Sequence, residues 1–231
     1  MFFNKHGFII VVLALGLLTG TFSRPGICEV VDCIVARVDA EIITLTDVRI
    51  VQAFGLGSGQ VDRPASMTLR QCLEAAVDRK VVISLAPVRI ALDEAEIDGL
   101  LERIKSRIEP AEWQRRLEEF GLEPQDLRPY LNDILLYEKI IALRFSQSVE
   151  VSLKEIEAYY QNVYVKTQEA RGEEPLPMVQ VLDIIESRIR KEKTEKQISL
   201  WIENLRRQAE VRIHTDCLEP GLVSKEESWV F

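Results

Sequence analysis

The chain has 231 residues, of which 47% are hydrophobic, and its 37 acidic residues outnumber 29 Lys and Arg to give a formal net charge of −8. This length and apolar content suffice for one ordinary domain with an ample core. Because nucleic-acid binding requires a positive face, an acidic chain without a basic run argues against a nucleic-acid partner.

The first residues have the pattern of a secretory signal peptide. Lys5 and His6 form a weakly basic start, Phe8–Leu18 is an unbroken apolar run, and small residues favour cleavage after Cys28. The apolar run is shorter than the roughly 20 residues that a membrane span needs. We therefore expect residues 1–28 to be removed on export, and an uncleaved inner-membrane anchor is the alternative.

Two short β-rich runs follow at 32–38 and 41–45, in which apolar and polar residues alternate as in half-buried strands. They predict a β-hairpin, although its turn lacks the favourable Asn-Gly pair and therefore suggests a loop longer than two residues. Thr46 is the predicted cap of a helix over 47–54. Glycines then mark the segment 55–65 as a loop.

Apolar residues at helical spacing next predict four helices in a row. They lie at 67–86, from Asp93 to about Ile108, from Pro110 to Gly121, and over 126–145. Pro87 ends the first of them, and Asp93 with Glu96 has the form of a capping box at the start of the second. Short connections of this kind make consecutive helices antiparallel neighbours.

The C-terminal third contains the longest predicted helix. Ser152 and Glu155 form a capping box that starts a helix toward Tyr164, and a polar break spans 169–178. A charged helix over 179–209 follows. One side of this helix is predicted to be buried, marked by Leu182, Ile185, Ile189, Ile198, Trp201 and Leu205.

Val211 and Ile213 have the pattern of a short terminal strand, and a strand so short is not stable singly. We therefore expect it to join the N-terminal hairpin and to bring the two ends of the domain together. The predicted fold class is mainly α: a helical core with a small β-hairpin near the N-terminus, joined by the C-terminal strand. Residues 217–231 are predicted to form a tail.

Three cysteines remain after the predicted cleavage, namely Cys33, Cys72 and Cys217. Export permits a disulfide. The candidate pair is Cys33, on the first strand, with Cys217, just past the last, and three unpaired thiols are an equal alternative. Cys72 has the pattern of a small buried residue, and the spacings match no zinc site.

The sequence carries no recognisable catalytic motif. Nucleophile-elbow, zinc-protease, Walker and dinucleotide-binding patterns do not occur. The glycines of 55–59 follow a helix rather than a strand, which favours a flexible loop over a phosphate cradle. The acidic pairs Glu94 with Glu96 and Glu118 with Glu119 are typical of solvated helix faces. We expect a protein without enzymatic activity, cofactor or metal.

Four stretches together resemble one family of exported proteins. The hairpin is VDCIVARVDAEIITLTDV (31–48), the next helix is LRQCLEAAVDRKVV (69–82), a later helix starts at VSLKEIEAYY (151–160), and the returning helix and strand cover 184–213. The set resembles the N-terminal domain of the SurA-type periplasmic chaperones of outer-membrane proteins. This resemblance implies a periplasmic location and a helical chaperone domain.

The resemblance also implies a domain in two parts. Residues 29–164 and 179–216 would form one chaperone domain, and 165–178 would replace the parvulin-type prolyl isomerase domain that many relatives carry at this place. Parvulin catalysis uses a pair of histidines, whereas this chain has only His6 and His214. We therefore expect a chaperone without isomerase activity, and a prolyl isomerase is the alternative that family membership alone suggests.

The resemblance and the apolar helices predict an ATP-independent holdase. It would bind unfolded exported or outer-membrane proteins through an apolar helical groove, as a monomer or weak dimer, with the outer-membrane assembly machinery as a further partner. The predicted peptide-binding residues are Leu101, Ile104, Trp113, Leu117, Phe120 and Tyr130. Burial in an ordinary core is the alternative for each. A dedicated subunit of one envelope secretion or assembly complex is the remaining hypothesis.

Overall fold

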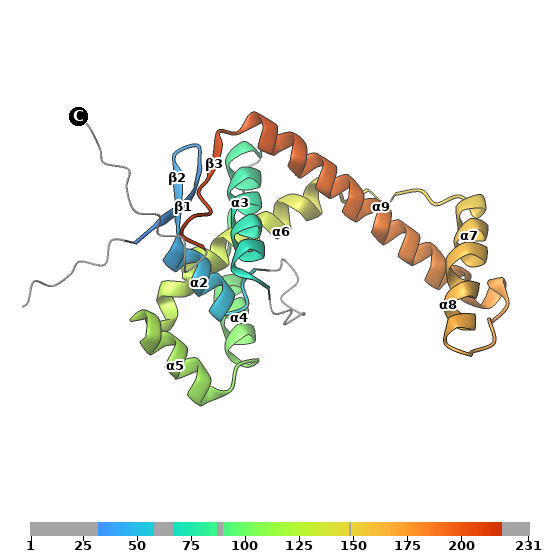
Figure 1. Ribbon diagram of the computed structural model, residues 1–231, viewed down its shortest axis with the longest axis horizontal. Helices are drawn as coiled ribbons and strands as arrows, with labels where there is room; N and C mark the ends of the chain where they lie inside the picture. The colour runs from blue at the N-terminus through green and yellow to red at the C-terminus, as the bar shows by residue number, and fades with distance from the viewer. Residues whose placement is uncertain (1–31, 58–66, 87–89, 148, 219–231) are drawn as a thin grey trace, which may run out of the picture. The chain divides into compact units, whose positions relative to one another are not determined.

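The computed structural model describes residues 32–57, 67–86, 90–147 and 149–218. In these residues the fold is mainly α with a small antiparallel sheet, as predicted (Figure 1). The predicted signal peptide, most of the predicted loop at 55–65, Pro87 and the tail beyond Leu218 lie outside them. None of the helices within them combines the length and the apolar character that crossing a membrane requires.

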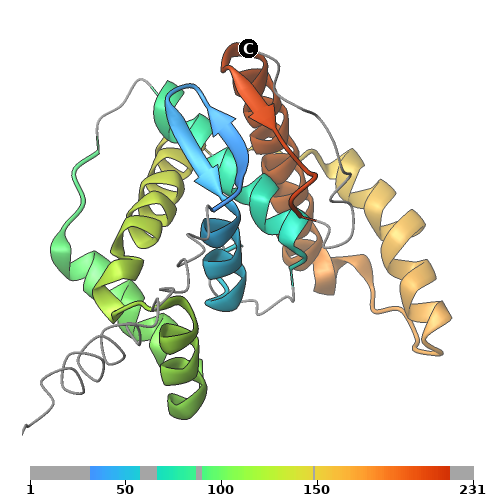
Figure 2. The same cartoon turned by 60° about the vertical axis from the view of Figure 1, so that its left-hand side comes forward.

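The sheet has the strand order β2-β1-β3 and is antiparallel throughout. Its strands are β1 (Ile34–Val38), β2 (Glu41–Thr44) and β3 (Val211–Ile213). The terminal strand therefore joins the hairpin, as predicted, and Figure 2 shows the three strands side by side, with α2 continuing from the hairpin.

The turn between β1 and β2 is tighter than the sequence suggests. Val38 pairs with Glu41, which leaves only two residues between the strands. Asp39 adopts φ 51°, a left-handed conformation that Asp tolerates better than most residues. Its backbone N–H donates to Glu210 O at 3.0 Å and its carboxylate accepts from Glu210 N–H at 3.0 Å. These two hydrogen bonds to Glu210, just before β3, stabilise the turn in the absence of an Asn-Gly pair.

A disulfide joins Cys33, next to β1, to Cys217, just beyond β3. This is the candidate pair of the sequence analysis. Cys72 is a free, buried thiol, and burial raises its pKa above the usual range. The disulfide closes the sheet covalently across 184 residues of chain.

The first described helix, α2 (Leu45–Ala53), is capped by Thr44 and not by Thr46 as predicted. Thr44 Oγ1 accepts the Asp47 N–H at 3.2 Å, while Asp47 Oδ2 accepts the Thr44 N–H at 2.8 Å. The reciprocal pair requires a carboxylate or carboxamide side chain three positions after the cap. Thr44 has one in Asp47, whereas Thr46 is followed at that spacing by Arg49.

The four predicted central helices are present with small shifts. They are α3 (Leu69–Leu85), α4 (Glu94–Lys105), α5 (Pro110–Phe120) and α6 (Arg128–Arg144), the last preceded by the 3-10 turn η1 (Pro124–Leu127). Asp93 caps α4 as predicted, and Gly121 ends α5 with φ 63°. The 3-10 turn takes up the residues with which α6 was expected to begin.

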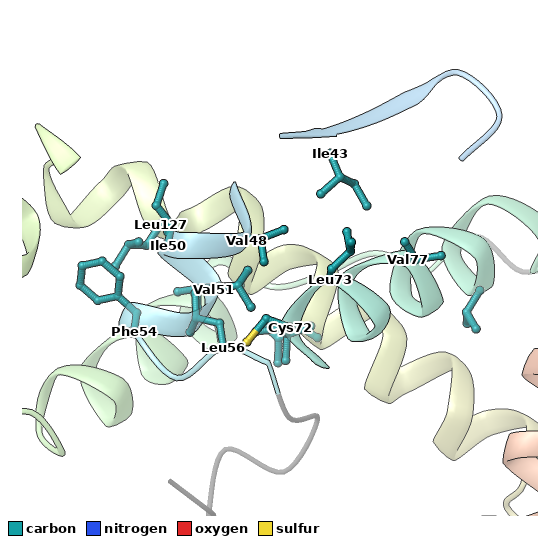
Figure 3. Packing of buried hydrophobic residues seen from close by; sticks show 14 of the residues in the cluster. Ile43, Val48, Ile50, Val51, Phe54, Leu56, Cys72, Leu73, Val77 and Leu127 are labelled. Carbon is teal, nitrogen blue, oxygen red and sulfur yellow. The ribbon is translucent and has the colours of Figure 1, made fainter. Parts of the chain in front are cut away.

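The main core surrounds α3, which contacts the hairpin, α2, α6 and α9. Figure 3 shows Ile43 of β2 directed toward Leu73 and Val77 of α3, with Val48 and Val51 of α2 beside them. Leu131 and Ile134 add the buried face of α6. Val35, Val38, Val81 and Leu127 are also fully buried in this core.

The segment after Ser152 is more helical than predicted. Helix α7 (Leu153–Tyr159) continues as a π-helical turn, η2 (Tyr160–Tyr164), and then as α8 (Val165–Ala170). The first part of the predicted polar linker at 165–178 is therefore helix. The long helix α9 (Met178–Gln208) follows.

Helix α9 buries two opposite faces, so the prediction of one buried side is wrong. Its N-terminal half packs Ile185 and Ile189 against Ile156 of α7, whereas its C-terminal half packs Ile202 with Leu205 into the main core. The nine residues from Ile189 to 198 span two and a half turns, which places the two apolar rows half a turn apart.

The middle of α9 is polar and holds the chain segment that connects α6 to α7. Arg190 Nε donates to Val149 O at 3.3 Å, and Lys193 Nζ donates to Glu150 O at 2.9 Å. Lys193 also pairs with Glu155 at 2.6 Å. This pairing lowers the pKa of Glu155 to about 2, mainly through the hydrogen bond from Lys193.

Candidate functional site

An open hollow with an apolar floor lies between the end of α4, helix α5 and η1. It encloses about 450 Å³, and we call it the Trp113 hollow. This volume falls in the range of pockets that hold ligands, about 300–1,000 Å³. Its lining includes Ile108, Trp113, Leu117 and Leu122, with Lys105, Gln114 and Glu123 as its polar members.

Trp113 forms a rigid part of this floor because only 5% of it is exposed and it packs edge-to-face on Phe54 at 5.3 Å. The walls meet because Gly121 turns the chain back after α5. The N–H of Leu122 donates to Leu117 O at 2.9 Å, so these two side chains are brought to the same place. The shape of the hollow therefore depends on Gly121, the C-cap of α5 that the sequence predicts.

Charged groups fix the helix that carries the hollow. Glu112 accepts hydrogen bonds from Arg115 at 2.7 Å and 2.8 Å and from Arg116 at 2.6 Å. These bonds lower the pKa of Glu112 to about 2, so it is ionised at neutral pH. Arg116 also donates to Ala53 O at the end of α2, which joins α5 to the main core.

The six predicted peptide-binding residues do not form one groove. Trp113 and Leu117 line the Trp113 hollow, although both are largely buried. Ile104 is fully within the main core, and Leu101 and Phe120 are half-buried against it. Tyr130 lines a different hollow. The role of these residues in peptide binding stays a prediction. Three of them lie at two separate hollows, Trp113 and Leu117 at one and Tyr130 at the other.

The second hollow lies between β2, α2, α3 and α6, encloses about 240 Å³, and is called here the Tyr130 hollow. Its apolar lining includes Ile42, Val51 and Ala76. The Tyr130 hydroxyl donates to Asp47 Oδ1 at 2.7 Å. Burial and this neighbouring carboxylate raise the pKa of Tyr130 well above its usual value, so the phenol stays protonated.

Sequence reasoning missed two cations at the Tyr130 hollow. Lys80 bridges Asp133 at 2.9 Å and Glu41 at 3.3 Å. Burial opposes its charge, but the two carboxylates outweigh this effect and raise the pKa of Lys80. Arg79 is only 6% exposed and donates to Leu56 O at 2.7 Å. The signal in the sequence that could have indicated them is the adjacent pair Arg79 and Lys80 within the apolar pattern of α3.

A third surface lies where α7 and α8 meet the start of α9. Tyr160 and Tyr164 stack at 5.6 Å, and the Tyr160 hydroxyl donates to Leu176 O at 2.8 Å. Five large apolar side chains of this region are exposed, namely those of Leu153, Val163, Leu176, Val179 and Ile184. Val179 is the most open of them, with 82% exposure. Exposed apolar side chains are typical of protein contact sites where they gather on one face.

The arrangement offers surfaces for binding. Among the residues that the structure describes, no group of three or more His, Cys, Asp or Glu is placed to hold a metal ion. No protein-family model and no curated protein matches the chain. The described residues form a mainly helical domain with a three-stranded sheet, and the Trp113 and Tyr130 hollows lie within it.

Proposed function

We propose that this protein is an exported, ATP-independent chaperone of the SurA type that holds unfolded outer-membrane or other exported proteins in the periplasm. The observation that carries the proposal is the open Trp113 hollow, in which the partly exposed Ile108 and Leu122 stand over the buried Trp113. Apolar surface of this kind, with few fixed polar groups, suits partners that share no common sequence. The signal-like N-terminus and the resemblance of the hairpin give further support.

The energy available at one hollow fits capture followed by passive release. Burying one Leu- or Phe-sized side chain contributes about 1.5–3 kcal/mol, whereas a dissociation constant of about 1 mM corresponds to about 4 kcal/mol. One contact alone therefore holds a client only briefly. Several such contacts on one chain add their effects through high effective concentration. No nucleotide is required for release.

The net charge of −8 supports the same proposal. Like-charged copies repel one another, which keeps a protein with exposed apolar surface soluble. The charge also favours neutral or basic client segments over acidic ones. A chaperone with this surface binds clients without precipitating with itself.

A dedicated subunit of an envelope assembly complex is the second candidate function. The exposed apolar side chains near Val179 favour it, because a permanent partner would cover them. Co-purification with a single stoichiometric partner, together with indifference to generic unfolded chains, would support this candidate. No feature of the described residues favours prolyl isomerisation: His214 lies directly after β3, and its N–H donates to Val35 O at 2.8 Å.

Light scattering tests the chaperone proposal. A denatured β-barrel protein is diluted into buffer with and without a several-fold excess of this protein. We expect the wild type to suppress aggregation, and Ile108→Asp with Leu122→Asp, at the wall of the Trp113 hollow, to remove most of the effect. Leu143→Asp with Leu200→Asp places the same two charges on exposed apolar positions elsewhere and serves as the control.

Absence of suppression by the wild type would refute the proposal. Equal suppression by the hollow variants and the wild type would refute the assigned surface. A refolding reaction limited by proline isomerisation tests the enzymatic alternative, and we expect no acceleration of it.

A further inference from the structure

Among the described residues no strand pairs with the outer edge of β2, and this edge lies directly beside the Tyr130 hollow. β2 stands at one end of the three-stranded sheet, and both Ile42 and Ile43 of this strand line the hollow. The other walls come from α2, α3 and α6. A strand added to this edge would therefore lie across the mouth of the hollow.

The hydrogen-bond pattern of the sheet directs the backbone groups of Ile42 out of this edge. The N–H of Asp39 donates to Glu210 on the β3 side, and backbone groups of successive strand residues point to opposite sides. Arg37, two residues earlier, therefore also faces β3. Because Ile42 is the partner of Arg37 in the hairpin, its own N–H and C=O point away from β1.

Side chains on an added strand would alternate between solvent and the hollow. Ile42 lies on the outer face with 53% exposure, whereas Ile43 is buried and directed at α3 (Figure 3). A client residue opposite Ile43 shares its face and reaches the hollow. About 240 Å³ suits a single apolar side chain better than a small-molecule ligand, whose pockets begin at about 300 Å³.

The rim of the hollow is acidic. Four carboxylates border it, those of Glu41, Asp47, Asp126 and Asp133. They face two cations, Lys80 and the buried Arg79. A segment with Lys or Arg next to an apolar residue therefore complements the charge of this rim, whereas an acidic segment is repelled.

Resting on the proposed chaperone function, we propose that the β2 edge is a strand-addition site for extended segments of unfolded clients. The client backbone pairs with Ile42, an apolar side chain enters the Tyr130 hollow, and a neighbouring Lys or Arg approaches the acidic rim. Backbone pairing does not depend on client sequence, and side chains that alternate into a pocket add selectivity. Unfolded β-barrel proteins carry this alternation along every strand.

The experiment measures fluorescence anisotropy of a labelled synthetic peptide of alternating valine and threonine with lysine at both ends. Ile42→Pro removes the outward N–H together with the Ile42 side chain, and proline is tolerated on an edge strand. Ala76→Leu fills the hollow and leaves the strand unchanged, so it tests the site even if the proline variant does not fold. Ile42→Val is the matched control. Circular dichroism and thermal unfolding verify the fold of each variant.

We expect both Ile42→Pro and Ala76→Leu to weaken peptide binding by about tenfold or more, and Ile42→Val to remain within about twofold of wild type. The same peptide with glutamate ends, or with alternate amides methylated, should bind at least about tenfold more weakly than the original. Unchanged affinity of a folded Ile42→Pro, or of the methylated peptide, would overturn the proposal.

The binding and aggregation assays together distinguish this inference from the chaperone function. If the wild type suppresses aggregation but does not bind the peptide, strand addition is wrong and the chaperone proposal stands. If it neither binds nor suppresses, both are wrong. If the free protein is a dimer that Ile42→Pro dissociates, the edge is an interface between two copies, and the inference is overturned.

Discussion

Removal of the disulfide between Cys33 and Cys217 should cost a large part of the stability of this protein. The disulfide closes a loop of 184 residues. In the chain-entropy description, a loop of this length restricts the unfolded chain by about 5 kcal/mol at 25 °C. That value is the upper part of the measured range, and domains are stable by only about 5–15 kcal/mol in total.

The assay is urea unfolding of the wild type and of a Cys33→Ser, Cys217→Ser variant. At a slope of about 2.5 kcal/mol per M, the midpoint of the variant should fall by about 2 M. Reductant should lower the wild-type midpoint to that of the variant. Reductant should lower the midpoint of Cys72→Ala by the same amount as that of the wild type, because Cys72 is a free, buried thiol that takes no part in the bond.

A variant midpoint within about 0.5 M of the oxidised wild type would refute this reasoning. It would mean that the ends of the domain are held as firmly by β3 and the core as by the covalent link. An effect of reductant on the double serine variant itself would equally contradict it.

Three further predictions concern single contacts. Tyr130→Phe should destabilise the fold by about 1–2 kcal/mol in thermal unfolding, because it removes a hydrogen bond to a carboxylate; an unchanged melting temperature would contradict this. Glu155 has a depressed pKa of about 2 against 4.5, so its pairing with Lys193 stabilises above about pH 4.5 and is lost as pH falls toward 2. The stability gap between wild type and Glu155→Gln should therefore close over that acidic range, and a constant gap would be inconsistent with the pairing. Ile202→Ala should cost about 2–5 kcal/mol of global stability, whereas Ile185→Ala should speed hydrogen exchange mainly in α7 and α8; equal effects on both regions would argue against two separate clusters.

Local signals predicted most of the secondary structure. The capping boxes at Asp93 and Ser152 and the helix-ending Gly121 have strict spacing and short range, so the sequence alone locates them. The cap of α2 was misplaced because Thr44 and Thr46 are both capping residues. Only the acidic residue three positions later distinguishes them.

Features that depend on distant parts of the chain were harder to predict. The two faces of α9 follow from the spacing between Ile189 and Ile198, yet the partner of each face is set by the tertiary fold. The separation of Trp113 from Tyr130 into two hollows depends on how α5 and α6 pack, which periodicity does not encode. Predicting that β2 is an outer strand requires the strand order, which the hairpin alone does not give.

Site-specific photo-crosslinking tests the central claim most directly. A crosslinking amino acid at Gln114, on the rim of the Trp113 hollow, is compared with one at Glu203, exposed on α9 and away from both hollows. With an unfolded β-barrel protein present, we predict adducts from Gln114 and few from Glu203, and none from either once the client has folded. Equal yields from the two positions, or no adduct from Gln114, would contradict the account that clients are held at an apolar hollow between these helices.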